Sequence, residues 1–223
     1  MPLTAVIWDF DGTILDTEWP AVEAARAEFE RVGLTLDLTE WAKTVGTANH
    51  EPWLEVLRRE ADGLDEPDDV IMARYRGLKN ATTDAADLLP GVPEVFAQLD
   101  QLGLPCAMAS SSSIEWVERH TRRHGLWGRF SSVATRTDVG HERTKPEPDL
   151  YLLAAERAGF AADGCLVIED SHHGVAAAKA AGMRVIAVPN RITSTHDFRH
   201  ADLVLESLGQ LDLAGLVERW SGE

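Results

Sequence analysis

Residues 5–16 read AVIWDFDGTILD, and this stretch decides the fold. Its first four residues are apolar, too few for an ordinary helix, and are typical of a buried strand. The strand runs directly into Asp9 and Asp11, and Gly12 permits a sharp turn after them. Because ligands of parallel α/β sheets bind at the carboxyl ends of the strands, both carboxylates are expected at the mouth of a sheet. Taken alone, the same residues also suit a simple turn, since Asp and Gly are common turn residues.

Five further short apolar runs complete a predicted sheet, at residues 106–109, 132–134, 165–168, 185–188 and 203–205. Stretches with apolar residues at helical spacing lie between them, at about 93–102, 112–124, 149–158 and 174–181. Ser112 with Glu115 three residues later is a capping-box pattern that opens the second of these helices. Strands that alternate with helices predict an α/β fold: right-handed βαβ units and a parallel sheet with helices on both faces.

Residues 17–88 interrupt this rhythm, because they hold helical patterns and no comparable strand run. The segment contains 16 acidic and 8 basic residues, a net charge of −8. We predict that it is an inserted α-helical cap domain, placed between the first strand and the rest of the sheet. The core then comprises residues 1–16 and 89–223, with Pro90-Gly91 marking the second joint.

The composition excludes several classes of partner. The 223 residues carry 21 Lys and Arg against 37 Asp and Glu, a formal charge of −16 at pH 7. Nucleic acids and anionic membranes are bound through clustered Lys and Arg, so neither is an expected partner. No apolar run approaches the roughly 18 residues of a membrane span, and the first ten residues lack a signal-peptide pattern. Cys106 and Cys165 lie in apolar runs and are expected to be reduced core residues, which suits a cytoplasmic protein.

Two more acids follow another predicted strand. Glu169 and Asp170 end the run at 165–168, which would bring them to the sheet edge that holds Asp9 and Asp11. Carboxylates this close disfavour ionisation unless a cation neutralises them. Oxygen ligands without Cys or a tight set of His favour Mg²⁺, which often shares its coordination with a substrate phosphate. The sequence therefore predicts a Mg²⁺ site at this edge.

A hydroxyl and a cation are expected at the same edge. Ser110 ends the run at 106–109, where its hydroxyl can donate to a phosphoryl oxygen and the backbone N–H groups that follow offer an anion site. Lys145 is followed by prolines at 146 and 148, which restrict the backbone around this point cation.

These residues together make the chain resemble the haloacid dehalogenase superfamily, specifically its phosphohydrolases of the β-phosphoglucomutase-like subgroup. The matching motifs are Asp9-Phe10-Asp11-Gly12-Thr13-Ile14-Leu15-Asp16-Thr17-Glu18, then Ser110, then Lys145-Pro146-Glu147-Pro148-Asp149, then Glu169-Asp170-Ser171. The resemblance spans nearly the whole chain. It implies a Rossmann-like parallel sheet with a helical cap inserted after the first strand.

The resemblance also implies a reaction: Mg²⁺-dependent hydrolysis of a small phosphorylated metabolite, such as a sugar phosphate, through an aspartyl-phosphate. Asp9 would be the nucleophile, and Asp11 would be the general acid and then the general base. Mg²⁺ would be held by Asp9, the backbone carbonyl of Asp11 and Asp170. Glu169 would assist the metal directly or through water.

Further contacts to the substrate are expected on the same basis. Ser110, Ser111 and Lys145 would bind the transferring phosphoryl group. The expected cap and hinge contacts are Thr17, Thr44, Gly46, Thr47, Asn49 and Arg76. Arg76 and its neighbour Arg74 would equally suit a solvated helix face. The chain is expected to be a monomer or a weak dimer.

Two alternatives to a phosphatase are a sugar-phosphate mutase and a non-catalytic phosphate-binding module. In β-phosphoglucomutases a His lies four residues after the Thr of the first motif, whereas the same count from Thr17 reaches Ala21. This departure favours hydrolysis over the mutase. Asp11 argues against the binding module, because such a module has no need of a general acid.

Overall fold

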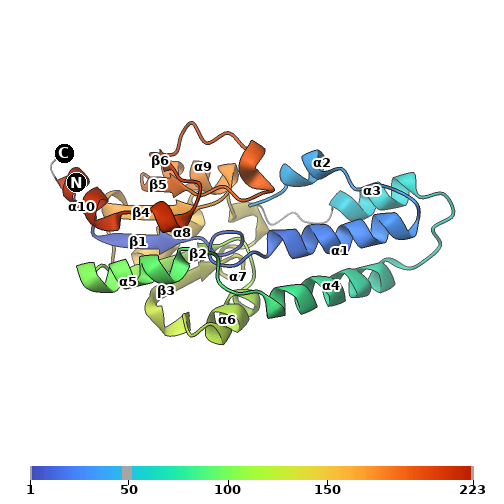
Figure 1. Cartoon of the computed structure of the whole chain (residues 1–223), viewed down its shortest axis with the longest axis horizontal. Coiled ribbons are helices and arrows are strands. Elements are labelled where there is room, and N and C mark those ends of the chain that lie inside the picture. Colours follow the sequence, from blue (N-terminus) through green and yellow to red (C-terminus); the bar gives the residue numbers. More distant parts are fainter. Residues whose placement is uncertain (1, 47–51, 222–223) are drawn as a thin grey trace.

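The computed structural model describes residues 2–46 and 52–221. Its centre is a six-stranded parallel sheet in the order β3-β2-β1-β4-β5-β6 (Figure 1). The strands are β1 (Ala5–Trp8), β2 (Cys106–Ser110), β3 (Phe130–Thr135), β4 (Cys165–Glu169), β5 (Arg184–Ala187) and β6 (Leu203–Val204). All six predicted strands are present, and the α/β fold class is confirmed.

Alternate residues of β1 face opposite layers of helices, as the period of a strand requires. Val6 and Trp8 belong to a cluster with residues of α5 (Val92–Leu102) and α10 (Leu213–Ser221). Ala5 and Ile7 belong to a second cluster with residues of α8 (Asp149–Ala158) and α9 (His172–Ala180). Helices therefore cover both faces of the sheet, and β1 is buried on each side.

Helices and short 3₁₀ turns complete the connections between strands. The remaining core elements are α6 (Ile114–Arg123), α7 (Arg136–Val139), η1 (Trp127–Arg129), η2 (His141–Arg143), η3 (Ala162–Gly164), η4 (Thr193–Thr195) and η5 (Leu208–Gln210). The predicted cap of α6 is wrong by one residue. Ser113 is the N-cap, and its hydroxyl accepts a hydrogen bond from the N–H of Trp116, whereas the Ser112 hydroxyl donates to Asp11.

Residues 16–46 and 52–86 form a helical region beyond the carboxyl ends of the strands (Figure 1). Its helices are α1 (Glu18–Arg31), α2 (Leu38–Ala42), α3 (Pro52–Glu60) and α4 (Asp68–Ala85). Phe29, Trp41, Trp53 and Ile71 belong to a separate hydrophobic cluster that takes Ile192 from the other part of the chain. The backbone of Leu15 bridges Leu88, so the chain leaves the core and returns to it at neighbouring points. The division at residues 17 and 88 into two domains stays a prediction.

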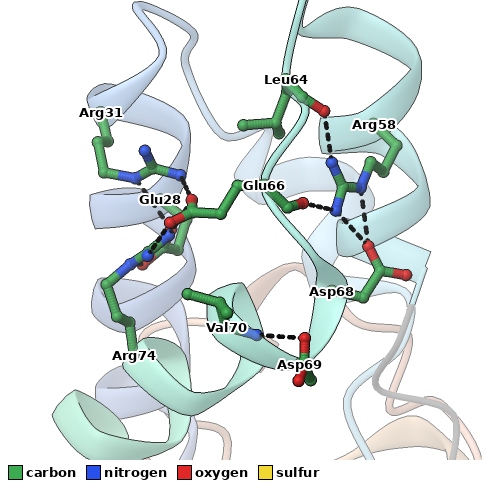
Figure 2. Close-up of polar contacts among 9 residues, drawn as sticks. All are labelled: Glu28, Arg31, Arg58, Leu64, Glu66, Asp68, Asp69, Val70 and Arg74. Carbon is green, nitrogen blue, oxygen red and sulfur yellow. Dashed lines mark hydrogen bonds and ion pairs between the residues drawn. The ribbon is translucent and has the colours of Figure 1, made fainter.

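Ion pairs bind α4 to α1 at a distance from the sheet. Figure 2 shows the guanidinium groups of Arg31 and Arg74 directed at the carboxylates of Glu28 and Glu66. Arg74 donates to both oxygens of Glu28, at 3.0 and 2.8 Å, and to Glu66 at 2.5 Å. The Glu28 side chain is only 6% exposed, so its charge is compensated by these arginines. The Arg74 side chain is therefore engaged in ion pairs that hold α4 against α1.

Among the described residues, no helix is both long and apolar enough to cross a membrane. Cys106 and Cys165 are buried and unpaired, as the sequence predicts.

Candidate active site

The acidic residues of the first and last motifs meet because β1 and β4 are neighbours. Trp8 pairs with Ile168 in the sheet, and the N–H of Asp9 donates to the Ile168 carbonyl at 3.0 Å. Carboxylate oxygens of Asp9, Glu169 and Asp170 lie within 4.8 Å of one another, and all three residues are buried. In the sheet β1 lies between β2 and β4. The strand order changes direction at β1, and α/β sheets bind ligands at such a switch point.

Lys145 lies between two of these carboxylates. Its Nζ donates to Glu169 at 2.7 Å and also to Asp9, and the lysine is 2% exposed. Burial lowers the pKa of this amine, but the charges of Asp9 and Glu169 outweigh burial and hold the pKa above its ordinary value. Lys145 is therefore a fixed cation that orients Asp9.

Glu169 accepts five hydrogen bonds. Its Oε1 accepts from Lys145 and from the Tyr151 hydroxyl at 2.8 Å, and its Oε2 accepts from the N–H groups of Asp170 and Ser171 and from the Ser171 hydroxyl. These donors counteract burial and lower the pKa of Glu169. Both oxygens are occupied, so this carboxylate positions its neighbours and is poorly placed to bind a metal directly.

Asp9 and Asp170 keep coordinating capacity that Glu169 lacks. Oδ2 of Asp9 is buried and has no hydrogen-bond partner, and Asp170 accepts from the Asn190 amide at 2.6 Å. Burial raises the pKa of Asp9 to about 7, and burial with the charge of Glu169 raises the pKa of Asp170 well above its ordinary value. Both carboxylates therefore resist ionisation unless a further cation arrives.

The residues at this point fit a hard divalent cation. Three carboxylates face one ammonium group, which leaves two formal negative charges when all are ionised. Asp9, Asp11, Asp170 and Glu18 are among the residues that line a cavity of about 20 Å³. A space of this size admits a single water or ion. Three features suit Mg²⁺: the ligands are oxygens, one buried carboxylate oxygen has no partner, and negative charge exceeds positive charge.

Asp11 lies in a cage of four donors. Thr17 and the indole of Trp116 donate to Oδ1 at 2.8 and 2.9 Å, while Ser112 and Ser110 donate to Oδ2 at 2.7 and 3.2 Å. Burial acts to raise the pKa of Asp11, but the hydrogen bonds from Ser112 and Trp116 outweigh it and lower the pKa. The second aspartate of the first motif is thus held in one orientation.

Glu18 is a fifth acid beside this group. It is 5% exposed, its Oε2 has no hydrogen-bond partner, and it lines the same cavity as Asp9 and Asp11. Burial, with the nearby charge of Asp11, raises the pKa of Glu18 to about 8, and Lys79 of α4 opposes this rise. Glu18 can therefore be a neutral carboxylic acid at pH 7 that offers both a donor and an acceptor.

Two glycines allow the close approach of these segments. Gly12 has φ +80°, and a Cβ there would collide with the carboxylate of Asp170. Gly46 has φ +85°, and a Cβ there would collide with the Ser171 hydroxyl. Positive φ values of this size are costly for other residues, so both positions need glycine for conformation as well as for space.

The contacts between the core and residues 42–46 use main-chain carbonyls. The Ser111 hydroxyl donates to the Gly46 carbonyl at 3.3 Å, and Nε2 of His196 lies 2.8 Å from the Ala42 carbonyl. Nε2 of His173 lies 3.3 Å from the carbonyl of Lys43. Gly46 and Ser111 also line the small cavity with Asp9 and Asp11, and their role as substrate contacts stays a prediction.

The structure describes two of the other predicted cap contacts, Thr44 and Arg76. Thr44 is half-buried and donates to the Trp41 carbonyl at 2.8 Å. Arg76 is exposed on α4, and no contact joins it to the acidic cluster in the described part of the chain. Thr47 and Asn49 lie outside the described residues.

Several residues of the site were missed by sequence reasoning. They are Glu18, Lys79, Ser112, Trp116, Tyr151 and Asn190. Glu18 stands in the first motif, so its position next to Thr17 was a usable signal. The others lie on helices or loops whose side chains converge only when the chain is folded, and their spacing in sequence carries no signal.

Comparisons of the sequence with known proteins identify its family. A family model described as haloacid dehalogenase-like hydrolase matches residues 3–182. YhcW of Bacillus subtilis (strain 168), named provisionally as a phosphatase, is 37% identical over 222 residues, which cover 99% of each chain. Hexitol phosphatase A of Escherichia coli (strain K12) is 33% identical over 216 residues, covering 92% of this chain and 91% of the relative.

Solved structures lead to the same family. The crystal structure of CbbY from Rhodobacter sphaeroides, a mutant in complex with xylulose-1,5-bisphosphate, superposes with a TM-score of 0.78 at 27% identity. It covers 96% of this chain and 99% of its own. A HAD family hydrolase from Deinococcus radiodurans R1 with bound phosphate and sodium has a TM-score of 0.77 at 30% identity, covering 97% and 96% of the two chains. With a family model that spans most of its length and this arrangement of acids, the chain belongs to the haloacid dehalogenase-like hydrolase family.

Proposed function

We propose that this phosphatase of the haloacid dehalogenase-like family hydrolyses a small sugar phosphate, with Mg²⁺ bound, through a phosphate ester on Asp9. The observation that carries the proposal is the state of Asp9. One of its oxygens is fixed by Lys145, and the other is buried, unpartnered and beside Asp11 and Asp170. A carboxylate held in this way is suited to attack a phosphorus atom.

In the first step, a carboxylate oxygen of Asp9 forms a bond to phosphorus while the bond to the leaving alcohol breaks. Asp11 must first take up a proton against the four donors that lower its pKa, and it then donates that proton to the leaving oxygen. In the second step, a water molecule attacks the same phosphorus, Asp11 accepts its proton, and inorganic phosphate leaves with Asp9 restored. Both steps depend mainly on placement and on charge, which the buried cluster provides.

Asp9, the Asp11 carbonyl and Asp170 would hold Mg²⁺, and Glu169 would act through Lys145 and through any water on the ion. When bound, the ion would offset the negative charge that the phosphoryl group brings to this acidic site. Lys145 would supply a second positive charge, and Ser110 and Ser111 would place hydroxyl and amide donors near the phosphoryl oxygens.

The substrate class is inferred from the relatives and from the cavity. The names of Hexitol phosphatase A and of the CbbY complex refer to a sugar alcohol and to a sugar bisphosphate. In this chain Glu18 lines the cavity with Asp11, and the charge of Lys79 acts on both, at the point where the leaving alcohol would be protonated. A carboxyl group and an amine at that point suit the hydroxyls of a sugar.

Hydrolysis is favoured over the mutase reaction by position 21. Ala21 is 3% exposed and belongs to the hydrophobic cluster of α1 to α4. It offers no ring nitrogen to exchange a proton at the site. We therefore expect β-glucose 1-phosphate, if it is consumed, to release inorganic phosphate and to form no glucose 6-phosphate.

The test is release of phosphate from a panel of sugar phosphates and from p-nitrophenyl phosphate, with added Mg²⁺. We expect Asp9→Asn to lose at least about 10³-fold in kcat, because the nucleophile is removed, and Ala21→His to remain a hydrolase. Retention of wild-type rates by Asp9→Asn would exclude the covalent route. If no ester of the panel is hydrolysed and the chain binds phosphate tightly, it is a binding protein.

A further inference from the structure

We propose that the helical region carries a second binding site, in a cavity between α1, α2 and α3, for a small, flat and neutral molecule with oxygen acceptors. The cavity has a volume of about 500 Å³. This volume lies within the range of about 300–1,000 Å³ that is usual for small-molecule sites. The inference does not depend on the proposed phosphatase function, because it concerns residues of the helical region alone.

The cavity is separate from the acidic cluster. Its described lining residues come from positions 29–44 and 53–60, whereas Asp9, Asp11 and Asp170 line the smaller cavity of about 20 Å³. No residue in the described part of the chain lines both. A molecule in the larger cavity would therefore meet other groups than a phosphate ester at the edge of the sheet.

Two buried tryptophans give the cavity hydrogen-bond donors that are not in use. Trp41 of α2 and Trp53 of α3 both line it, and each is 5% exposed. Neither indole N–H has a hydrogen-bond partner among the residues that the structure describes. A buried indole N–H usually finds an acceptor, and it can only donate. A molecule that fits this cavity must therefore supply acceptors.

The wall of the cavity suits a flat apolar body. Phe29 and Leu36 line it and are buried in one hydrophobic cluster with the two tryptophans. The Trp53 ring also packs against the ring of Tyr75, at a centroid distance of 4.9 Å, which restricts its rotation. Aromatic side chains that are held in this way present fixed faces to a planar molecule.

The charged residues of the cavity are exposed and already engaged. Lys43 pairs with Glu40 at 2.6 Å, and Arg59 pairs with Glu60 at 3.2 Å. The Asp37 carboxylate accepts hydrogen bonds from two backbone N–H groups at the start of α2. Both cations thus face carboxylates, so this rim favours a neutral molecule over an anion such as a phosphate ester.

The cavity adjoins the segment through which the helical region meets the core. The side chains of Trp41 and Lys43 belong to its lining, while the carbonyls of Ala42 and Lys43 lie against His196 and His173. A molecule bound in the cavity would therefore contact this segment from the side opposite to its main-chain contacts in sequence terms, through its side chains.

Coumarin is the probe, because it is flat and neutral and has two oxygen acceptors and no N–H or O–H group. In the ¹⁵N-labelled wild-type chain, each indole N–H gives its own NMR signal. We expect coumarin to shift the signals of Trp41 and Trp53 downfield and to saturate with a Kd on the order of 1 mM. Trp8 is the internal control, because its indole N–H is also buried and unpartnered but lies in the core cluster, and its signal should stay in place.

Trp41→Phe and Trp53→Phe each remove one indole N–H and keep an aromatic ring. Each variant lacks one signal, which assigns it. Naphthalene has the same two fused rings as coumarin and no acceptor. We expect each variant to weaken coumarin binding about two- to tenfold more than naphthalene binding, as loss of one neutral hydrogen bond implies. If a variant does not fold, contacts between the ring protons of Trp53 and Tyr75 assign the Trp53 signal in the wild type.

The possible results decide the matter. If coumarin moves neither signal up to its solubility limit, water is the occupant of the cavity and the proposal is wrong. A shift that does not saturate, or that moves Trp8 equally, would mean unspecific association and would also overturn it. Equal losses for coumarin and naphthalene in both variants would exclude the indole N–H groups as the donors. These measurements need no turnover, so failure of the proposed phosphatase activity would leave them unaffected.

Discussion

The carboxylates at the carboxyl end of the sheet differ in how many hydrogen bonds they accept. Glu169 has five donors, whereas Oδ2 of Asp9 has none and is buried. The difference follows from the chain, because Glu169 is the last residue of β4 and the backbone N–H groups that follow turn back onto its side chain. One carboxylate is thereby used for structure, which leaves its neighbours for a ligand.

A consequence at this scale concerns Mg²⁺ and stability. An ion that binds only the folded chain stabilises it by about 2.7 kcal/mol when its free concentration is 100 times the Kd. We expect Mg²⁺ to raise the free energy of unfolding of the wild-type chain, measured with urea, and to have little effect on Asp170→Asn. An equal rise in both proteins would mean that the ion binds elsewhere on this acidic surface.

Substitutions of Lys145 and Tyr151 should lower the stability of the buried cluster by different amounts. Lys145→Met leaves two buried carboxylates without their cation and should cost about 3–5 kcal/mol in the absence of metal. Tyr151→Phe removes one of the five donors to Glu169 and should cost about 1.5–3 kcal/mol. Urea unfolding of both variants measures these values. Equal costs would contradict the central place of Lys145.

The ends of some helices and strands can be predicted from the sequence more closely than those of others. The strand over residues 5–8 was predicted to the residue, since four apolar residues end sharply in Asp9. The helix predicted over about 149–158 is also present, with Gly159 at φ +72° as its end. The start of α6 was misplaced, because Ser112 and Ser113 are equivalent as caps and only the folded site engages the first with Asp11.

The site was predictable only where its residues lie at strand ends. Asp9, Ser110, Glu169 and Asp170 could be placed together because a parallel sheet brings the ends of its strands to one edge. Trp116 and Lys79 could not, since they reach the site from the sides of helices whose packing angle no local pattern reveals. For the same reason Arg74 and Arg76 were indistinguishable in the sequence.

The packing of α4 on α1 separates these two arginines. Arg74→Ala would remove donors to Glu28 and Glu66, leaving the buried Glu28 with Arg31 as its remaining ion-pair partner among the described residues. Arg76→Ala, on the exposed side of the same helix, is the matched control. We expect a lower urea midpoint for Arg74→Ala than for Arg76→Ala, with kcat/KM for p-nitrophenyl phosphate similar in both. A selective loss of activity in Arg76→Ala would restore this residue as a substrate contact.

For the whole molecule, the formal charge of −16 contrasts with the anionic substrate that we propose. The buried cluster resolves the contrast, because the acids that would repel a phosphate are those that attract a divalent cation and hold Lys145. A small ester can enter with its metal, whereas a long polyanion meets the negative surface first.

Acid sensitivity is expected where the two parts of the molecule meet. Burial and the neighbouring rings of His173 and His196 lower the pKa of His172 to about 4, from an ordinary 6.5, while Asp197 and Glu169 oppose this. The unfolded chain therefore binds this proton more readily. The stability from this group is present above about pH 6.5 and is lost as the pH falls toward 4.

We expect His172→Gln to lose less free energy of unfolding than the wild-type chain between pH 7 and pH 5. His141→Gln is the control, because His141 is exposed and should follow the wild type. Urea unfolding at the two pH values gives the comparison. A parallel fall in all three proteins would assign the acid sensitivity to other groups.

The contacts between the core and residues 42–46 have an evolutionary consequence. Ser111, His173 and His196 meet carbonyl groups of the main chain, which every residue type possesses. The exposed Lys43 side chain can be exchanged without loss of the carbonyl that His173 meets, whereas Ala42 is packed in the hydrophobic cluster of α1 to α4. Descendants of this protein could therefore change the exposed side chain at position 43 and keep the main-chain contact to the core.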